Sequence, residues 1–136
     1  MKLNMTDALL ASLIGGTIIA VMLNIPYLNY INCLCCAGIL AGGFFGAFFY
    51  KTRNPLDTKS GALIGLFSGL AGGILSTIIS IVLYVAFNQA AMYRNIATQA
   101  GLAWGPMAVL TLGLIMIFIL SVIFGTLGGL IAGKVF

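Results

Sequence analysis

The chain alternates between long stretches without charge and short polar segments. Residues 8–50, 60–93 and 95–133 contain no Asp, Glu, Lys or Arg. A helix that spans a bilayer needs about 20 apolar residues. The first stretch therefore has room for two spans joined by a turn, and each of the others has room for one. The pattern predicts an all-α integral membrane protein with four spanning helices in one domain, residues 1–136.

Helix breakers and polar clusters divide these stretches. The predicted spans are roughly 7–23, 33–50, 61–87 and 106–133. Pro26 ends the first span, because the residue before a proline disfavours helix. Residues 51–60 form the one strongly polar loop, and Ser60 is the predicted N-cap of the third span. At 1.5 Å per residue the last two spans reach about 40 Å, more than the bilayer core of about 30 Å, so they must tilt or protrude.

Residues 88–105 form the longest segment between two predicted spans. Met92, Ile96 and Ala100 follow helical spacing, and Trp104 is an aromatic residue of the kind found at membrane interfaces. The pattern predicts an interfacial helix in this outer loop. An ordinary connecting loop is the alternative.

Composition agrees with a membrane location. Hydrophobic residues make up 62% of the 136 residues and charged residues 6%, and the mean hydropathy is +1.19. An average soluble domain has about 25% charged residues, and so short a chain could not bury this much apolar surface. The lipid bilayer is therefore the expected environment, and nucleic acid is not an expected partner.

The same composition leaves few groups for chemistry. The chain has no His, and its two carboxylate side chains, Asp7 and Asp57, lie in a first helical turn and in the polar loop. Proton-coupled transporters carry ionisable residues within their spans, and this chain does not. We predict a non-enzymatic protein without catalytic residues or cofactors. Hydroxyl residues in the spans lack a general base and are expected to form hydrogen bonds between helices. They are Ser12, Thr17, Ser68, Ser76, Thr77, Ser80, Thr111, Ser121 and Thr126.

The basic residues predict the orientation. In this topology five of the six lie on one side of the membrane and only Arg94 lies on the other. The five are Lys2, Lys51, Arg53, Lys59 and Lys134. Because cytoplasmic segments carry the excess of Lys and Arg, both termini are expected in the cytoplasm and the chain in the cell inner membrane. A dual topology would need a near-balanced count.

Ten of the eighteen glycines follow a regular pattern in the spans. A spacing of four keeps each row on nearly one helix face, where small residues let helices approach closely. The predicted helix-packing positions are Gly38, Gly42 and Gly46; Gly61, Gly65, Gly69 and Gly73; and Gly125, Gly129 and Gly133. The first span offers a weaker row, Ala8, Ser12, Gly16 and Ala20. The rows favour a four-helix bundle packed by glycine zippers. As an alternative, one or more rows face another subunit or line a narrow pore.

A faint internal repeat accompanies the glycines. Residues 11–16 resemble 68–73, and residues 38–42 resemble 125–129. This favours two helical hairpins in the same orientation, as in transporters with parallel repeats. Chance similarity between glycine-rich helices is the alternative.

Three cysteines, Cys33, Cys35 and Cys36, cluster at the start of the second span. Thiolates suit soft metals, but the chain has no fourth Cys and no His to complete a tetrahedral site. We therefore interpret them first as small residues that pack a helix end, with a disulfide and a metal site as the alternatives.

The segment 25–36, the Gly42-Gly43 pair, the basic loop and the segment 61–65 resemble an uncharacterised group of small prokaryotic membrane proteins with four glycine-rich spans. The resemblance covers roughly residues 8–85 and implies the fold without an activity. Size and helix count also resemble the fluoride channels. Their phenylalanine-rich third-helix motif is not matched by residues 73–80, and their dual topology conflicts with the charge distribution.

These observations together predict an accessory or assembly subunit of a larger membrane complex, with other membrane subunits or copies of itself as partners. The alternative is a small homo-oligomeric channel or transporter lined by the glycine-rich helix faces.

Overall fold

The computed structural model describes residues 4–24, 37–87, 90–99, 101 and 105–136, which form helices and turns and contain no strand. The helices are α1 (Met5–Asn24), α3 (Ala37–Lys51), α4 (Thr58–Ala86), α5 (Ala90–Gln99) and α6 (Gly105–Val135). By length and composition α1, α4 and α6 can cross a membrane, and α3 is a shorter apolar helix. The all-helical prediction is confirmed for the described residues.

The helices start and end close to the predicted positions. The spans predicted at 7–23, 61–87 and 106–133 differ from α1, α4 and α6 by one to three residues at each end. The second span was expected over 33–50, whereas α3 covers Ala37–Lys51; residues 33–36 lie outside the described part. The helix expected within the outer loop is present as α5.

The N-cap of α4 is Asp57, so the prediction that Ser60 caps this helix is wrong. The Asp57 backbone is extended, and its carboxylate accepts a hydrogen bond from the Thr58 N–H at 3.2 Å. Its carbonyl accepts the first intrahelical bond, from Gly61 N–H at 2.8 Å. A carboxylate is a preferred capping group and also favours the positive end of the helix dipole. Ser60 lies inside the first turn, where it is buried.

Two glycines shape the passage from α5 to α6. Gly101 follows α5 with φ of 66°, and Gly105 opens α6 with φ of 77°. Other residues adopt this left-handed backbone only at a cost of about 1–2 kcal/mol. Glycine, which has no Cβ, adopts this backbone without that cost and therefore suits both positions.

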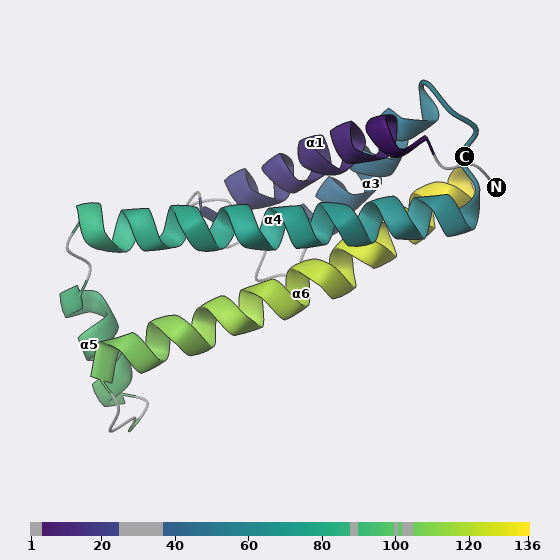
Figure 1. Cartoon of the computed structure of the whole chain (residues 1–136). Helices are drawn as coiled ribbons and strands as arrows, with labels where there is room; N and C mark the ends of the chain where they lie inside the picture. Colours follow the sequence, from purple (N-terminus) through teal and green to yellow (C-terminus); the bar gives the residue numbers. More distant parts are fainter. Residues whose placement is uncertain (1–3, 25–36, 88–89, 100, 102–104) are drawn as a thin grey trace.

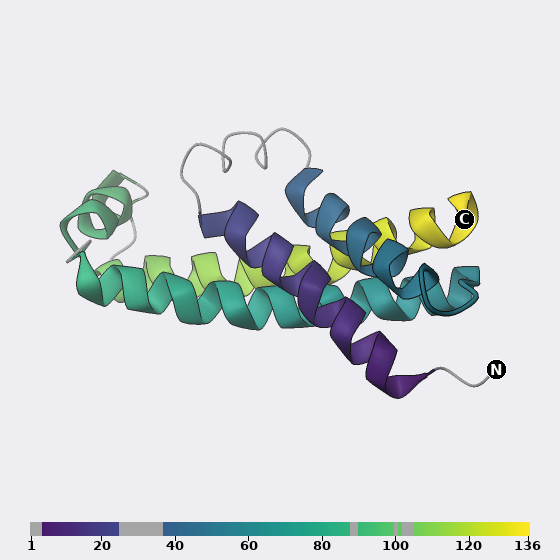
Figure 2. The ribbon, with the colours of Figure 1, turned by 90° about the horizontal axis from the view of Figure 1, so that it is seen from above.

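Apart from α5, the helices run back and forth between the two ends of the structure, and α1 crosses α4 obliquely (Figure 2). α1 and α4 point in one direction, and α3 and α6 point in the other (Figure 2). The start of α1, the turn between α3 and α4 and the end of α6 lie together at what we call the loop end, and α5 lies at the opposite end (Figure 1). α1 and α3 lie beside the part of α4 and α6 nearer the loop end, and α4 and α6 continue beyond them towards α5 (Figure 2).

Most buried residues are small, and large apolar side chains cover the outside. Of the buried residues of α4, Ile64 is the only one larger than Ser. Large hydrophobic side chains such as Leu9, Phe67 and Ile123 are exposed. Lipid tails are as apolar as Leu, so burial of large side chains gives no driving force in a bilayer, and close packing of small residues does. The arrangement matches a protein surrounded by lipid.

Candidate functional site

α4 and α6 approach each other through two of the predicted glycine rows. A Cβ added at Gly65 would meet the Gly125 carbonyl oxygen and lie 2.9 Å from the Gly129 Cα, closer than real Cβ contacts. In the same way Gly61 faces Gly129 and Gly69 faces the Ser121 carbonyl. The remaining members of these rows also lie against neighbouring elements of the chain, Gly73 against Phe118 and Gly133 against Thr58.

The row on α3 faces α1 and α4. A Cβ at Gly42 would lie 2.8 Å from the Gly15 carbonyl oxygen and would meet Ile19. A Cβ at Gly46 would lie 2.6 Å from the Ser68 Oγ and 3.1 Å from the Ala11 carbonyl oxygen. Gly38, the third member, is half-buried.

Two consecutive glycines of one helix pack against two different neighbouring helices. The rows spaced by four residues did not predict this. Consecutive helical residues point about 100° apart. Gly42 faces α1 whereas Gly43 faces Gly125 of α6. Gly128 faces the Leu40 carbonyl of α3 whereas Gly129 faces α4. Each apolar helix holds one such doublet: Gly15-Gly16, Gly42-Gly43, Gly72-Gly73 and Gly128-Gly129. The doublets themselves are the sequence signal for Gly15, Gly43, Gly72 and Gly128.

Three hydroxyls are buried among these contacts. The Oγ atoms of Ser12, Ser68 and Ser121 have no hydrogen-bond partner among the described residues. Ser68 lies where α4 meets α1 and α3, because a Cβ at Gly15 or at Gly46 would be 2.6 Å from its Oγ. Most buried polar groups in proteins are hydrogen-bonded, so these three are the unusual polar points of the interior.

The prediction that hydroxyl residues bond between helices is wrong for four threonines. The hydroxyls of Thr17, Thr77, Thr111 and Thr126 each donate to the carbonyl four residues earlier in the same helix, at 2.6–2.8 Å. This bond satisfies the hydroxyl without a neighbouring helix, so it forms wherever a helical threonine faces lipid or small residues.

Asn24 provides the polar link between α1 and α4. Its Nδ2 donates to the Ser76 Oγ at 3.1 Å and to the Ala20 carbonyl at 2.9 Å. Its Oδ1 accepts a hydrogen bond from the Ser80 hydroxyl at 3.2 Å. The amide thereby ties the last residue of α1 to α4.

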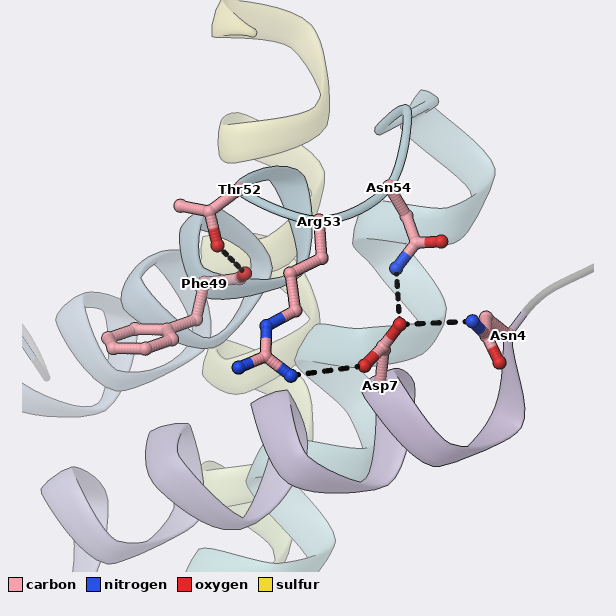
Figure 3. Close-up of polar contacts among 6 residues, drawn as sticks. All are labelled: Asn4, Asp7, Phe49, Thr52, Arg53 and Asn54. Carbon is pink, nitrogen blue, oxygen red and sulfur yellow. Dashed lines mark hydrogen bonds and ion pairs between the residues drawn. The ribbon is translucent and has the colours of Figure 1, made fainter.

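Asp7 is the centre of a polar cluster at the loop end (Figure 3). Its Oδ2 accepts hydrogen bonds from the side-chain amides of Asn4 at 3.0 Å and Asn54 at 2.8 Å. Its Oδ1 lies 3.5 Å from the Arg53 Nη1. The Asn4 backbone N–H donates to the Tyr50 hydroxyl at 3.3 Å. These contacts join the start of α1 to the end of α3 and to the loop that follows.

Two small clefts flank α1 near this end. The cleft between α1 and α3 has a volume of about 80 Å³ and is lined by Asp7, Leu10, Ala11, Ile14, Phe49 and Arg53. The cleft between α1 and α4 has a volume of about 100 Å³ and is lined by Met5, Ala8, Leu9, Ser12 and Phe67. Of these two clefts, the one between α1 and α3 is lined by both charged and apolar residues.

Within the described residues the ionisable side chains of Asp, Lys and Arg lie at the two ends of the structure. Arg94 lies on α5, and the others lie at the loop end (Figure 1). The latter are Asp7, Lys51, Arg53, Asp57, Lys59 and Lys134. The apolar helices between the two ends therefore carry no charge across the thickness of a bilayer core.

The order of apolar helices and charged ends can be compared with known families. A family model described as MJ1491 transmembrane domain matches residues 9–136. The chain belongs to the MJ1491 transmembrane domain family. This family is uncharacterised, so the resemblance to an uncharacterised group of small membrane proteins is confirmed. Comparisons with curated proteins and with solved structures give no match.

Membership of the MJ1491 family also decides the environment of the helices. The match includes α3 to α6 and most of α1, whereas the resemblance seen in the sequence covered roughly residues 8–85. A transmembrane-domain family together with long apolar helices makes this protein a small, multi-pass integral membrane protein.

The cysteines of this MJ1491-family chain, Cys33, Cys35 and Cys36, lie outside the described residues. We expect their simultaneous replacement by Ser to leave folding and membrane insertion unchanged, because three thiols do not complete a four-coordinate site. Elemental analysis of the purified protein and non-reducing electrophoresis check this. Stoichiometric zinc, copper or iron that is lost in the triple variant together with the folded state would contradict the packing interpretation.

Proposed function

We propose that this protein is a non-enzymatic accessory or assembly subunit of a larger membrane complex in the cell inner membrane. The observation that carries the proposal is the length of α6. Its stretch Met107–Val135, which is apolar except for Lys134 near the end, has 29 residues. That is about 43 Å, and a bilayer core of about 30 Å would hold it only at a tilt of about 45°, beyond the usual range of 0–40°.

The surplus length lies in a part of the structure with few neighbours. We call residues 81–86 of α4 and 105–120 of α6 the outer arm. On α4 it begins after Ser80, which hydrogen-bonds Asn24 at the end of α1, and it continues towards α5 (Figure 2). Met107 is 66% exposed at one end of α6, and Val135 is 64% exposed at the other. Apolar side chains are thus exposed along more length than a bilayer covers. A second membrane protein packed on the outer arm would shield the surplus from water.

Gly113 supports the same interpretation. A Cβ added there would meet nothing within 4 Å, unlike the glycines where α1, α3, α4 and α6 meet. Glycine costs about 1 kcal/mol relative to Ala in a helix. A glycine on an open face of a membrane helix suits the close approach of another helix.

We further propose that α1, α3, α4 and α6 form a four-helix bundle held by glycine zippers. The contacts of Gly42, Gly65 and Gly129 with neighbouring backbone support this. The same contacts favour an accessory subunit over a channel lined by glycine faces, because such a channel would have to separate helices that already meet at these glycines.

Site-specific photo-crosslinking in native membranes tests the accessory role. A photoreactive residue at Met116, on the outer arm, is expected to give an adduct with one other membrane protein in constant ratio. The matched control is Leu13 of α1, which is also exposed but lies outside the outer arm. We expect only lipid adducts there. Lipid adducts alone at both positions, with the purified chain a monomer, would contradict the proposal.

A homo-oligomeric channel is the second candidate, and the buried hydroxyls of Ser12, Ser68 and Ser121 favour it. Hydroxyls without protein partners can bind water or an ion that passes between helices. Ion flux into vesicles that contain only this chain, together with a defined homo-oligomer by native mass spectrometry, would support the channel and exclude an accessory role as the sole function.

The proposed orientation places both termini in the cytoplasm. Reporter fusions at Asp57 and Phe136 are expected to give cytoplasmic signals, and a fusion at Asn95 an external one. The reason is that Lys51, Arg53, Lys59 and Lys134 gather at the loop end, whereas Arg94 is on α5. A cytoplasmic signal from residue 95 would reverse the proposed topology.

A further inference from the structure

We propose that the cleft between α1 and α3 at the loop end binds an anionic phospholipid. The phosphate lies against the Arg53 guanidinium, and one acyl chain runs along α1 over Leu10 and Ile14. The proposal depends on the loop end lying at a membrane surface, and it is independent of whether the protein serves as an accessory subunit or a channel.

The order of charged and apolar residues along the cleft matches the order of headgroup and acyl chain in a lipid molecule. On α1 the lining residues Asp7, Leu10, Ala11 and Ile14 follow the spacing i, i+3, i+4 and i+7 and form one stripe. From Asp7 to Ile14 the stripe extends about 10 Å along the helix axis. The charged residue lies nearest the loop end, and the apolar residues lie deeper. A phospholipid at a membrane surface presents its headgroup and its acyl chains in the same order.

Arg53 has the chemistry that a phosphate requires. Its side chain is 69% exposed, and its ion pair with Asp7 joins one guanidinium nitrogen, Nη1, to the carboxylate at 3.5 Å. A guanidinium carries five N–H donors in a planar fork that matches phosphate oxygens. Figure 3 shows the side chain reaching from the loop between α3 and α4 towards α1. The phosphate can therefore approach Arg53 from the open side of the cleft.

The Asp7 carboxylate does not prevent Arg53 from binding a phosphate. Its side chain is 18% exposed, and its Oδ2 is held by the amides of Asn4 and Asn54. Two neutral donors thus already stabilise the carboxylate, and it does not rely on Arg53 alone. The carboxylate also fixes one edge of the guanidinium, which reduces the conformational freedom that Arg53 would lose on binding a phosphate.

The charges around the cleft complement an anionic lipid. At the loop end the described side chains include four basic residues and two acidic ones, a net charge of +2. The Lys51 ammonium lies over the Phe136 ring, 4.2 Å from its centroid, which leaves Arg53 as the cation that lines the cleft. Basic residues near a membrane surface attract anionic lipids electrostatically.

Lipid titration of the full chain in a nonionic detergent tests the proposal. We expect phosphatidylglycerol to raise the melting temperature and to remain bound in native mass spectrometry, and phosphatidylcholine to do neither. Arg53→Gln should weaken the apparent affinity for phosphatidylglycerol about tenfold, the loss of one charged hydrogen-bonding partner. The matched control Lys59→Gln removes the same charge at the same end but outside the cleft, and should change the affinity by less than about twofold.

A second variant examines the apolar half of the cleft. Leu10→Trp places a large ring at the exposed rim and should abolish retention of phosphatidylglycerol without lowering the melting temperature in detergent alone. If Arg53→Gln does not fold, Arg53→Lys and Leu10→Trp still decide the question. Equal effects of Arg53→Gln and Lys59→Gln, or equal shifts with phosphatidylcholine, would overturn the proposal. The same shift in melting temperature with glycerol phosphate alone would assign the site to a free phosphate and overturn the proposal of a lipid site. Evidence that a second copy of the chain covers the cleft would overturn it as well.

Discussion

Gly69→Leu is expected to destroy the contact between α4 and α6 and to lower the free energy of unfolding by at least about 3 kcal/mol, the upper part of the range for overpacked interiors. Even a Cβ at this position would meet the Ser121 carbonyl and lie 2.9 Å from the Val122 Cα. These are backbone atoms, so no rotamer change relieves the overlap and the helices must separate. Gly42→Leu should behave similarly, because a Cβ there meets the Gly15 carbonyl oxygen at 2.8 Å. Thermal unfolding of the purified protein in detergent measures both.

Gly113→Leu is the matched control, since it makes the same chemical change in an apolar helix where a Cβ meets nothing within 4 Å. Its melting temperature in detergent should equal or exceed that of the parent, because Leu forms helix better than Gly. Leu66→Ile serves as a second, mild control on α4. All the variants should still insert into the membrane, because insertion depends on apolar side chains and not on packing. If Gly69→Leu and Gly42→Leu were as stable as Gly113→Leu, the glycine rows would have no packing role.

Ser68→Leu is expected to destabilise the fold by about 2–3 kcal/mol, whereas Ser68→Ala should be neutral or slightly stabilising. The Ser68 side chain is fully buried, and its Oγ is close to Gly15 and Gly46, so no room exists for a larger group. The hydroxyl itself has no hydrogen-bond partner among the described residues, so its removal loses no bond and relieves the cost of burying a polar group. Thermal unfolding of both variants measures whether each substitution lowers or raises the stability.

Ser76→Ala is the control that separates a bonded hydroxyl from one without a partner. The Ser76 Oγ accepts a hydrogen bond from the Asn24 side chain at 3.1 Å, so its loss should cost about 1 kcal/mol. A loss of stability in Ser68→Ala as large as in Ser76→Ala would show that Ser68 has a partner, such as a water molecule. Loss of ion flux in Ser68→Ala with unchanged stability would instead favour the channel.

The proposals for the outer arm and for the cleft concern different surfaces and can fail separately. The outer arm consists of α4 and α6 near α5, and the cleft lies between α1 and α3 at the loop end (Figure 1). Gly113→Leu should weaken the binding of a partner protein to the outer arm and leave phosphatidylglycerol binding unchanged. Arg53→Gln should weaken phosphatidylglycerol binding and leave the binding of the partner protein unchanged. Each variant is thus a control for the other in the same preparation.

The positions and environment of the helices could be predicted from the sequence. A span is a local property, since about 20 apolar residues without charge make it, whatever packs against it. Three predicted spans therefore differ from α1, α4 and α6 by only one to three residues at each end. The gathering of basic residues at one end was likewise predictable, because once the spans are known the charges of each loop follow. The N-cap of α4 was mispredicted, since Asp57 and Ser60 both suit a cap and only the backbone of the loop selects one.

The partners of each small residue were decided by tertiary structure alone. The sequence by itself determined that Gly42, Gly65 and Gly129 lie on small helix faces, but a spacing of four does not say which helix a face meets. The structure places Gly42 against α1 and Gly43 against α6, so a single turn contacts two neighbours. It also brings Asp7 together with Arg53 and Asn54, which follow it by 46 and 47 positions in the chain, and no local pattern indicates this contact. The physical reason is that insertion depends on the summed apolarity of one segment, whereas helix contacts depend on the fit between backbones from distant parts of the chain.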